Sequence, residues 1–240
     1  MLATLLAPVT RRLVYPSGET RIAATETDYA LTVAGAELRG WVVNPGQARA
    51  LVYFGGNGEP LDWLRPVLAD RFPAHTSYLI AYRGYGASGG RPSQAALTAD
   101  ALALVDHAAE RHPDAPVDVI GRSLGSGVAM QVAARRPIER LVLVTPFDSL
   151  AGAAADLFPR LPMRRLVADA WDSTAVAARV SARILVLRAG RDELVRPPRT
   201  DALLRSLRPD TRVVDLPEAD HADIAADPAS WRAVEDFLSR

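Results

Sequence analysis

The stretch Val117-Asp118-Val119-Ile120-Gly121-Arg122-Ser123-Leu124-Gly125 decides the fold. Its first four residues form a short, β-branched and mostly apolar run, as in a buried strand. Residues 127–135 are apolar on nearly every face, as in a helix packed on a sheet. Between them lies Gly-x-Ser-x-Gly, a pattern typical of a sharp strand-to-helix turn with glycine on both flanks. Ser123 is therefore a candidate nucleophile, with its hydroxyl exposed above the sheet.

The same alternation of short apolar runs and helical patterns continues along most of the chain. Residues 28–33 and 37–43 flank a turn and predict an antiparallel hairpin. The other predicted strands are 50–54, 77–82, 117–120, 141–144, 184–187 and 212–216, and the predicted helices are 60–71, 93–111, 124–135, 198–207 and 228–238. Such alternation predicts an α/β fold with a mostly parallel sheet and helices on both faces.

One interval, at about 147–181, breaks this alternation because it contains only short helical pieces interrupted by prolines. An insertion of this length is more often functional than idle, so we expect a short helical cap on a single domain of residues 1–240. Its apolar side chains either form a roof over the site or anchor the insertion to the core. They are Leu157, Phe158, Leu161, Met163, Leu166 and Trp171.

The composition excludes several classes of function. The 240 residues include 28 arginines, no lysine and 28 acidic residues, so the net charge of zero provides no long-range field for nucleic acid or an anionic membrane. The absence of cysteine and the presence of only four histidines argue against a metal site. No window approaches the ~20 apolar residues of a membrane-spanning helix. We expect a cytoplasmic protein, although the apolar residues 1–10 could rest on a membrane surface.

A serine nucleophile needs a general base, and His221 is the best candidate among the four histidines. His221 follows the predicted strand at 212–216, and loops after the strands of an open α/β sheet are where ligands bind. His75 precedes a strand, His107 lies within a helix, and His112 ends that helix, where the helix dipole favours it.

The acid that orients the base is predicted to be Asp192, which follows the strand at 184–187 after a glycine turn. Asp148 is the alternative, although N-capping of the insertion is the better interpretation of that residue. The resulting order of Ser123, Asp192 and His221 is the order expected of an α/β-hydrolase.

An oxyanion hole needs two backbone N–H donors. The residue after the nucleophile, Leu124, provides one, and the glycine-rich loop 54–59 is expected to provide the other through Asn57. The alternative is that this loop is an ordinary turn into the next helix. Further candidate contacts for a substrate are Gly56, Tyr85, Arg122, Phe158 and Trp171.

These motifs resemble the α/β-hydrolase superfamily, in particular its small, compact-cap serine aminopeptidase-like members. The resemblance covers nearly the whole chain from about residue 28. It rests on residues 82–88 (Tyr-Arg-Gly-Tyr-Gly-Ala-Ser), 121–125, 145–149 (Thr-Pro-Phe-Asp-Ser), 190–192 (Gly-Arg-Asp) and 220–221 (Asp-His). It implies an eight-stranded sheet with an antiparallel second strand, and a catalytic triad of Ser123, His221 and Asp192 that needs no cofactor.

The chain departs from that family at two positions. The oxyanion loop commonly reads His-Gly-Asn, whereas residues 55–57 read Gly-Gly-Asn, and the fourth strand often ends in Asp, where this chain has Ala81. Neither change removes a member of the triad.

The reaction that we expect is hydrolysis of an ester or thioester of a small to medium acyl group, through an acyl-enzyme intermediate. The alternatives are an aminopeptidase or amidase using the same triad, and a non-catalytic binding module on the hydrolase scaffold. Arg122 and Arg83 could bind a substrate carboxylate or phosphate, but arginines at such positions more often pair with acids at the edge of the core.

Overall fold

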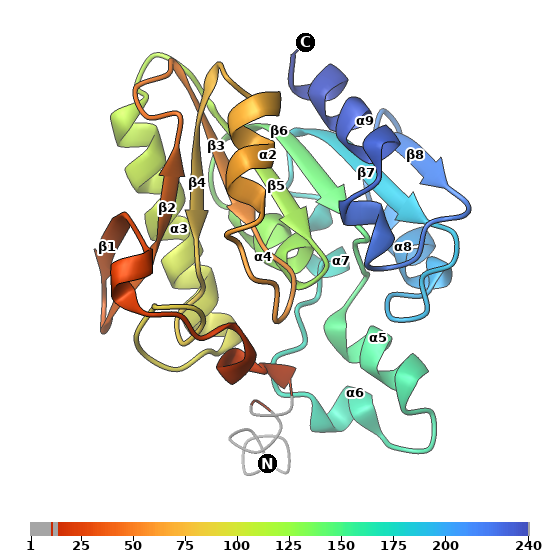
Figure 1. The fold of residues 1–240 in the computed structure, drawn as a ribbon. Helices are drawn as coiled ribbons and strands as arrows, with labels where there is room; N and C mark the ends of the chain where they lie inside the picture. Colours follow the sequence, from red (N-terminus) through yellow and green to blue (C-terminus); the bar gives the residue numbers. More distant parts are fainter. Residues whose placement is uncertain (1–10, 12–13, 240) are drawn as a thin grey trace.

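The computed structural model describes residue 11 and residues 14–239, and its centre is a sheet of eight strands in the order β1-β2-β4-β3-β5-β6-β7-β8 (Figure 1). Only β2 runs antiparallel to its neighbours β1 and β4, while the remaining pairs are parallel. This arrangement confirms the α/β-hydrolase fold expected from the sequence. The strands are β1 (Tyr29–Val33), β2 (Ala36–Val43), β3 (Arg49–Phe54), β4 (His75–Ile80), β5 (Val117–Arg122), β6 (Ile138–Val144), β7 (Arg183–Ala189) and β8 (Arg212–Leu216).

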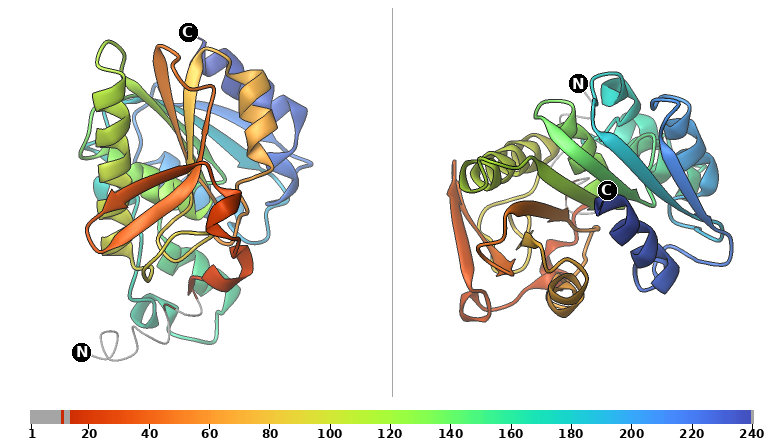
Figure 2. Two further views of the ribbon diagram at one scale, coloured as in Figure 1. Left: turned by 60° about the vertical axis from the view of Figure 1, so that its left-hand side comes forward. Right: turned by 90° about the horizontal axis from the view of Figure 1, so that it is seen from above.

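Helices cover both faces of this sheet. They are α2 (Leu64–Arg71), α3 (Gln94–Arg111), α4 (Leu124–Ala133), α5 (Leu150–Leu157), α6 (Met163–Leu166), α7 (Thr174–Ala177), α8 (Pro197–Leu204) and α9 (Pro228–Leu238), with short 3₁₀ turns η1 (Ser17–Thr20), η2 (Ala24–Glu26) and η3 (Asp223–Ala225). Figure 2 shows α2 and α9 on one face and α3 and α4 on the other. Each face has its own apolar core, because the parallel strands are buried on both sides.

The predicted elements differ from the observed ones mainly at their ends. Strand β6 begins at Ile138, three residues earlier than expected, because Glu139 and Arg140 interrupt its apolar run. Arg140 is nevertheless buried, since its guanidinium lies 3.3 Å from the carboxylate of Asp118 on β5. A pattern of apolar residues does not reveal the start of this strand, because the strand there carries a charged residue that is buried as an ion pair.

The segment between β6 and β7 contains α5, α6 and α7 and no strand, as expected for the insertion at about 147–181. Helix α5 is capped by Ser149, whose Oγ accepts a hydrogen bond from the Gly152 amide at 3.1 Å. The expectation that Asp148 would be this cap is therefore wrong, because its carboxylate instead pairs with Arg199 at 3.2 Å. Figure 1 shows α5 and α6 projecting beyond the end of the sheet.

Candidate active site

Ser123 occupies the turn between β5 and α4 in a conformation that is rare for a residue with a side chain. Its φ is 52° and its ψ is −117°, so its backbone is strained, as at the nucleophile turn of α/β-hydrolases. A Cβ on Gly125 would collide with the carbonyl of Phe54, and a Cβ on Gly121 would collide with the carbonyl of Gly125. The two glycines are therefore required by the close approach of α4 to β3 and β5.

The structure brings Ser123, His221 and Asp192 together from three separate loops. The Ser123 Oγ lies 3.0 Å from His221 Nε2, and His221 Nδ1 lies 2.7 Å from the Asp192 carboxylate. The side chain of His221 is 16% exposed and that of Asp192 is 1% exposed, so the contact between the candidate base and its acid is largely shielded from water. This is the geometry in which an imidazole can take the proton of a serine hydroxyl while a carboxylate fixes its tautomer.

The orientation of Asp192 is fixed by its own loop. One carboxylate oxygen accepts hydrogen bonds from the backbone amides of Leu194 at 2.9 Å and Val195 at 2.7 Å, which leaves the other oxygen for His221. Asp148, the alternative acid, faces Arg199 instead.

The other three histidines have structural partners. His75 lies 3.3 Å from the buried carboxylate of Asp118, and His107 contacts the hydroxyl of Tyr29. His112 is the C-cap of α3, as expected from the helix dipole. His221 is therefore the only described histidine that contacts Ser123.

Two backbone amides beside Ser123 are available to an oxyanion. Leu124 is the first residue of α4, and Asn57 lies in the loop after β3 and lines the same cavities as Ser123. Across residues 14–239, no group accepts a hydrogen bond from either amide. Helix N-termini carry such free donors together with a partial positive charge, which favours an anion at this position.

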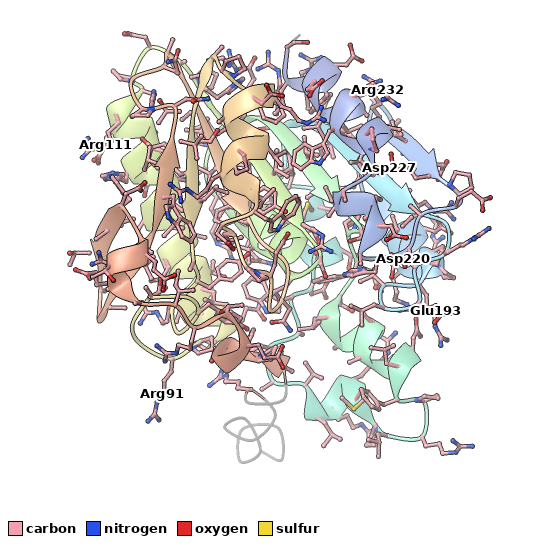
Figure 3. The ribbon with its side chains drawn as sticks, in the orientation of Figure 1. Arg91, Arg111, Glu193, Asp220, Asp227 and Arg232 are labelled. Atoms are coloured by element: carbon pink, nitrogen blue, oxygen red, sulfur yellow. The ribbon has the colours of Figure 1, made fainter. Side chains whose placement is uncertain are left out.

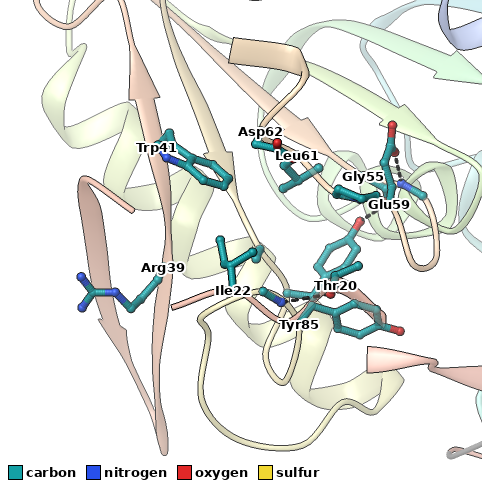
Figure 4. Close-up of a pocket in the computed structure, with 14 residues that line it drawn as sticks. Thr20, Ile22, Arg39, Trp41, Gly55, Glu59, Leu61, Asp62 and Tyr85 are labelled. Atoms are coloured by element: carbon teal, nitrogen blue, oxygen red, sulfur yellow. Dashed lines mark hydrogen bonds between the residues drawn. The ribbon is translucent and has the colours of Figure 1, made fainter. Parts of the chain in front are cut away.

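The loop after β3 is held by three side chains in place of the histidine that is common in related proteins. Glu59 accepts a hydrogen bond from the Gly56 amide at 2.5 Å, and the hydroxyl of Tyr82 donates to the Gly55 carbonyl at 2.8 Å (Figure 4). Tyr53 donates to Glu59 at 3.3 Å. Burial, and next the carboxylate of Glu59, raise the pKa of Tyr53 well above its ordinary value, so this hydroxyl remains a donor.

Two cavities meet at Ser123. The larger, of about 620 Å³, is lined by apolar residues of the cap and by Phe147, Leu124 and Val195. The smaller, of about 430 Å³, is more polar and is bordered by the loop after β3, Arg122 and His221. Ser123, Asn57 and Leu194 border both, so a substrate that spans the two cavities would place its central bond at the serine.

The sequence profile of the family described as serine aminopeptidase, S33 matches residues 47–178. This chain belongs to that family. Its structure also superposes on that of an esterase from Pyrococcus furiosus, Pf2001, with a TM-score of 0.69 at 19% sequence identity, covering 90% of this chain and 92% of the other. The chain is thus a hydrolase of the α/β fold.

Relatives of this S33 family member also occur among curated sequences. It is 32% identical over 226 residues to "Uncharacterized protein Rv2307c" of Mycobacterium tuberculosis, covering 89% of this chain and 80% of that protein. A shorter match, 42% identical over 74 residues, is to the lysophosphatidylserine lipase ABHD12 of Gallus gallus and covers 29% of this chain and 19% of the lipase.

Several residues proposed as substrate contacts have other roles in this S33 family member. Trp171 is fully buried and donates from Nε1 to the hydroxyl of Tyr15 at 2.9 Å, so it anchors the cap rather than lining its cavity. Tyr85 is buried beneath the oxyanion loop, where its hydroxyl donates to the side chain of Asn57 at 2.8 Å. Phe158 does line the larger cavity. Periodicity could not separate these cases, because all three aromatic residues lie in loops or at helix ends.

The remaining proposed contacts lie closer to the reactive serine. Gly56 borders the smaller cavity, but its amide is engaged by Glu59. Arg122 also borders this cavity, and its guanidinium lies 3.2 Å from Glu59 and donates to the His221 carbonyl at 3.0 Å. Arg83 pairs with Asp100 through two hydrogen bonds of 2.8 and 2.6 Å. Both arginines therefore pair with acids of the fold, and sequence reasoning missed Glu59 as the partner of Arg122.

The predictions about the first ten residues lie outside the described part of the chain. Among the described helices, none is both long enough and apolar enough to cross a bilayer.

Proposed function

We propose that this protein is a serine hydrolase that cleaves esters or thioesters of medium-length acyl groups. The observation that carries the proposal is the position of the Ser123 hydroxyl, 3.0 Å from His221 Nε2 and at the junction of an apolar and a more polar cavity. A cavity of about 620 Å³ falls within the range of typical small-molecule sites, so the acyl group need not be small.

The geometry supports a reaction in two stages. Ser123 Oγ attacks the carbonyl carbon as His221 takes its proton, and the amides of Leu124 and Asn57 donate to the developing oxyanion. The tetrahedral intermediate collapses, His221 gives the proton to the leaving alcohol or thiol, and an acyl-serine remains. Water then attacks this acyl-enzyme with His221 again as base, which releases the acid and restores Ser123.

Ester substrates are supported by the lining of the cavities and by related proteins. The larger cavity, which we assign to the acyl group, presents mostly apolar side chains, and the structural neighbour from P. furiosus is named an esterase. The name of the S33 family suggests an aminopeptidase instead. Such an enzyme needs a carboxylate for the substrate ammonium group, but Glu59, the only acidic residue of the described lining at the smaller cavity, already faces Arg122.

The test is a comparison of p-nitrophenyl esters from acetate to dodecanoate with aminoacyl p-nitroanilides. We expect kcat/KM to rise from acetate to medium chains and the anilides to be poor substrates. The Ser123→Ala variant controls for contaminating hydrolases. Faster cleavage of anilides than of every ester would favour the peptidase, and a lack of turnover on all substrates, with no reaction of Ser123 with a fluorophosphonate, would favour a non-catalytic module.

A further inference from the structure

Exposed apolar side chains gather at the mouth of the larger cavity. Five large apolar side chains are exposed among the described residues, and four of them line this one cavity: Leu157, Phe158, Leu161 and Leu194. Phe158 is 53% exposed and Leu161 is 52% exposed. Scattered apolar residues on a surface need no explanation, but a cluster around a cavity mouth marks a surface that something else covers.

Three arginines lie within the same segment, which we call the cap tip and define as residues 157–166. Arg160, Arg164 and Arg165 are exposed, and none has a carboxylate partner in the part of the chain that the structure describes. The neighbouring acidic residues Asp156 and Asp169 are already paired, with Arg199 and Arg11 respectively. The cap tip therefore combines apolar groups with an uncompensated positive charge, although the chain as a whole is neutral.

An exposed carboxylate, Glu193, precedes Leu194 in the sequence (Figure 3). It belongs to the loop after β7 and not to the cap tip. Figure 1 shows α5 and α6 standing away from the sheet, so that, among the described residues, the cap tip can meet a flat surface before the sheet and its helices do.

We propose that the cap tip docks on an anionic phospholipid bilayer. Leu157, Phe158 and Leu161 would enter the boundary between headgroups and acyl chains, while the arginines reach the phosphate level, as in interfacial segments that join a basic and an apolar face. A second protein is a poorer occupant, because a ten-residue protrusion is small beside the roughly 20–30 residues that each side of a stable protein interface provides.

This docking would also deliver substrate, a part of the inference that rests on the proposed function. The apolar side chains that meet the bilayer line the cavity that ends at Ser123. An acyl chain of a membrane ester could pass from the lipid phase to the serine without crossing water. The substrate class is then an amphiphilic ester with its acyl chain in the bilayer, a finer assignment than an ester in solution.

The test uses the Ser123→Ala protein, so that binding is measured without turnover. Its cosedimentation is compared for vesicles of phosphatidylcholine alone and vesicles with about 30% phosphatidylglycerol, at low and high salt. We expect binding to the anionic vesicles that weakens with salt. Because each arginine near an anionic surface contributes roughly fivefold, the triple variant Arg160→Gln, Arg164→Gln, Arg165→Gln should bind about a hundredfold more weakly.

Matched variants control for net charge and for apolar surface. The triple variant Arg111→Gln, Arg205→Gln, Arg232→Gln removes the same charge from exposed arginines elsewhere, two of which Figure 3 shows far from α5 and α6. It should keep most of its affinity for the vesicles. The pair Phe158→Ser and Leu161→Ser should weaken binding at least tenfold. Val213→Ser should not, since Val213 is the one exposed large apolar residue of the described chain that does not line the larger cavity. Unchanged melting temperatures would show that all variants fold.

The proposal is overturned if the protein binds neither kind of vesicle, if it binds both equally, or if both triple variants lose affinity alike. It is also overturned if sedimentation shows a dimer that the cap-tip substitutions dissociate and that does not bind vesicles. A different result would refute the proposed function. Ser123 of the unmodified protein would then fail to react with a fluorophosphonate, while vesicle binding persisted.

Discussion

Arg122 is bonded both to Glu59, at 3.2 Å, and to the backbone carbonyl of His221, at 3.0 Å. Glu59 in turn accepts the Gly56 amide at 2.5 Å. One arginine thus connects the nucleophile turn, the oxyanion loop and the loop of the general base, although it is not a member of the predicted triad. We interpret Arg122 as a positioning residue.

The substitution Arg122→Met tests this role. It leaves the nearly buried carboxylate of Glu59 without its counter-charge, so we expect a loss of about 3 kcal/mol in the free energy of unfolding. The loops also lose their common anchor, and kcat/KM on a soluble ester should fall roughly ten- to a hundredfold, since small displacements of catalytic groups are costly. Urea denaturation and steady-state kinetics measure the two effects.

A second variant separates positioning from stability. Adding Glu59→Gln to Arg122→Met removes the unpaired charge and should restore most of the stability. The bond to the His221 carbonyl stays absent, so kcat should remain low. Recovery of kcat together with stability would show that Arg122 acts only on the fold.

The glycine requirement at the nucleophile turn is tested by Gly125→Ala. The new methyl group would meet the carbonyl oxygens of Phe54 and Gly55, neither of which can move without disturbing β3 and the oxyanion loop. We expect destabilisation of about 3 kcal/mol and a collapse of activity. Gly18→Ala is the matched control, because within residues 14–239 no atom beyond its two chain neighbours lies within 4 Å of the added Cβ. Equal stability of the two variants in urea denaturation would contradict the packing argument.

The anchor of the cap is tested by Tyr15→Phe. The Tyr15 hydroxyl accepts from Trp171 Nε1 at 2.9 Å and donates to Asp169 at 3.0 Å, and all three side chains are buried. Removing the hydroxyl leaves a buried indole N–H without an acceptor, which should cost about 2 kcal/mol in the free energy of unfolding. Trp171→Phe deletes that N–H. It should therefore lower the free energy of unfolding less in the Tyr15→Phe variant than in the unmodified protein. Strict additivity in urea denaturation would argue that the two residues are not coupled.

The sheet, and the proximity of Ser123, Asp192 and His221, could be predicted from the sequence because both depend on local patterns. Runs such as residues 184–187 are continuously apolar, as required of strands that are buried on both faces, and the structure places them in the sheet. Ser123, Asp192 and His221 each follow such a strand, so the topology alone brings them to one edge. In the structure, Ser123 Oγ lies 3.0 Å from His221 Nε2, and His221 Nδ1 lies 2.7 Å from the Asp192 carboxylate.

The remaining features depend on contacts between distant segments. The pairing of Arg122 with Glu59 joins residues 63 positions apart, and either charge alone could equally have faced solvent or a ligand. Trp171 and Phe158 lie in one irregular segment with similar apolar neighbours, yet the first is buried and the second is exposed. Which of the two side chains is buried depends on the path of the cap over the core, and no periodic pattern in the sequence encodes that path.

The size of the acyl cavity is tested by Ala154→Phe. Ala154 lies on α5 and lines the larger cavity, so a phenyl ring there should displace a long acyl chain but not a short one. We expect kcat/KM for p-nitrophenyl decanoate to fall at least tenfold relative to the acetate, since each methylene group that loses its place in an apolar pocket costs about 1–3 kcal/mol. Ala175→Phe, at an exposed position of α7, should leave the ratio unchanged. An equal loss on both esters with Ala154→Phe would contradict the assignment of this cavity to the acyl chain.

The central claim is that Ser123 is a nucleophile activated by His221. It is tested most directly by treating the folded protein with a fluorophosphonate and locating the adduct by peptide mass spectrometry. We predict one adduct, on Ser123, and at least a hundredfold slower labelling in the His221→Ala variant, because the serine then lacks its base. No adduct on Ser123 in protein with a cooperative thermal transition, or equal labelling rates with and without His221, would contradict the account.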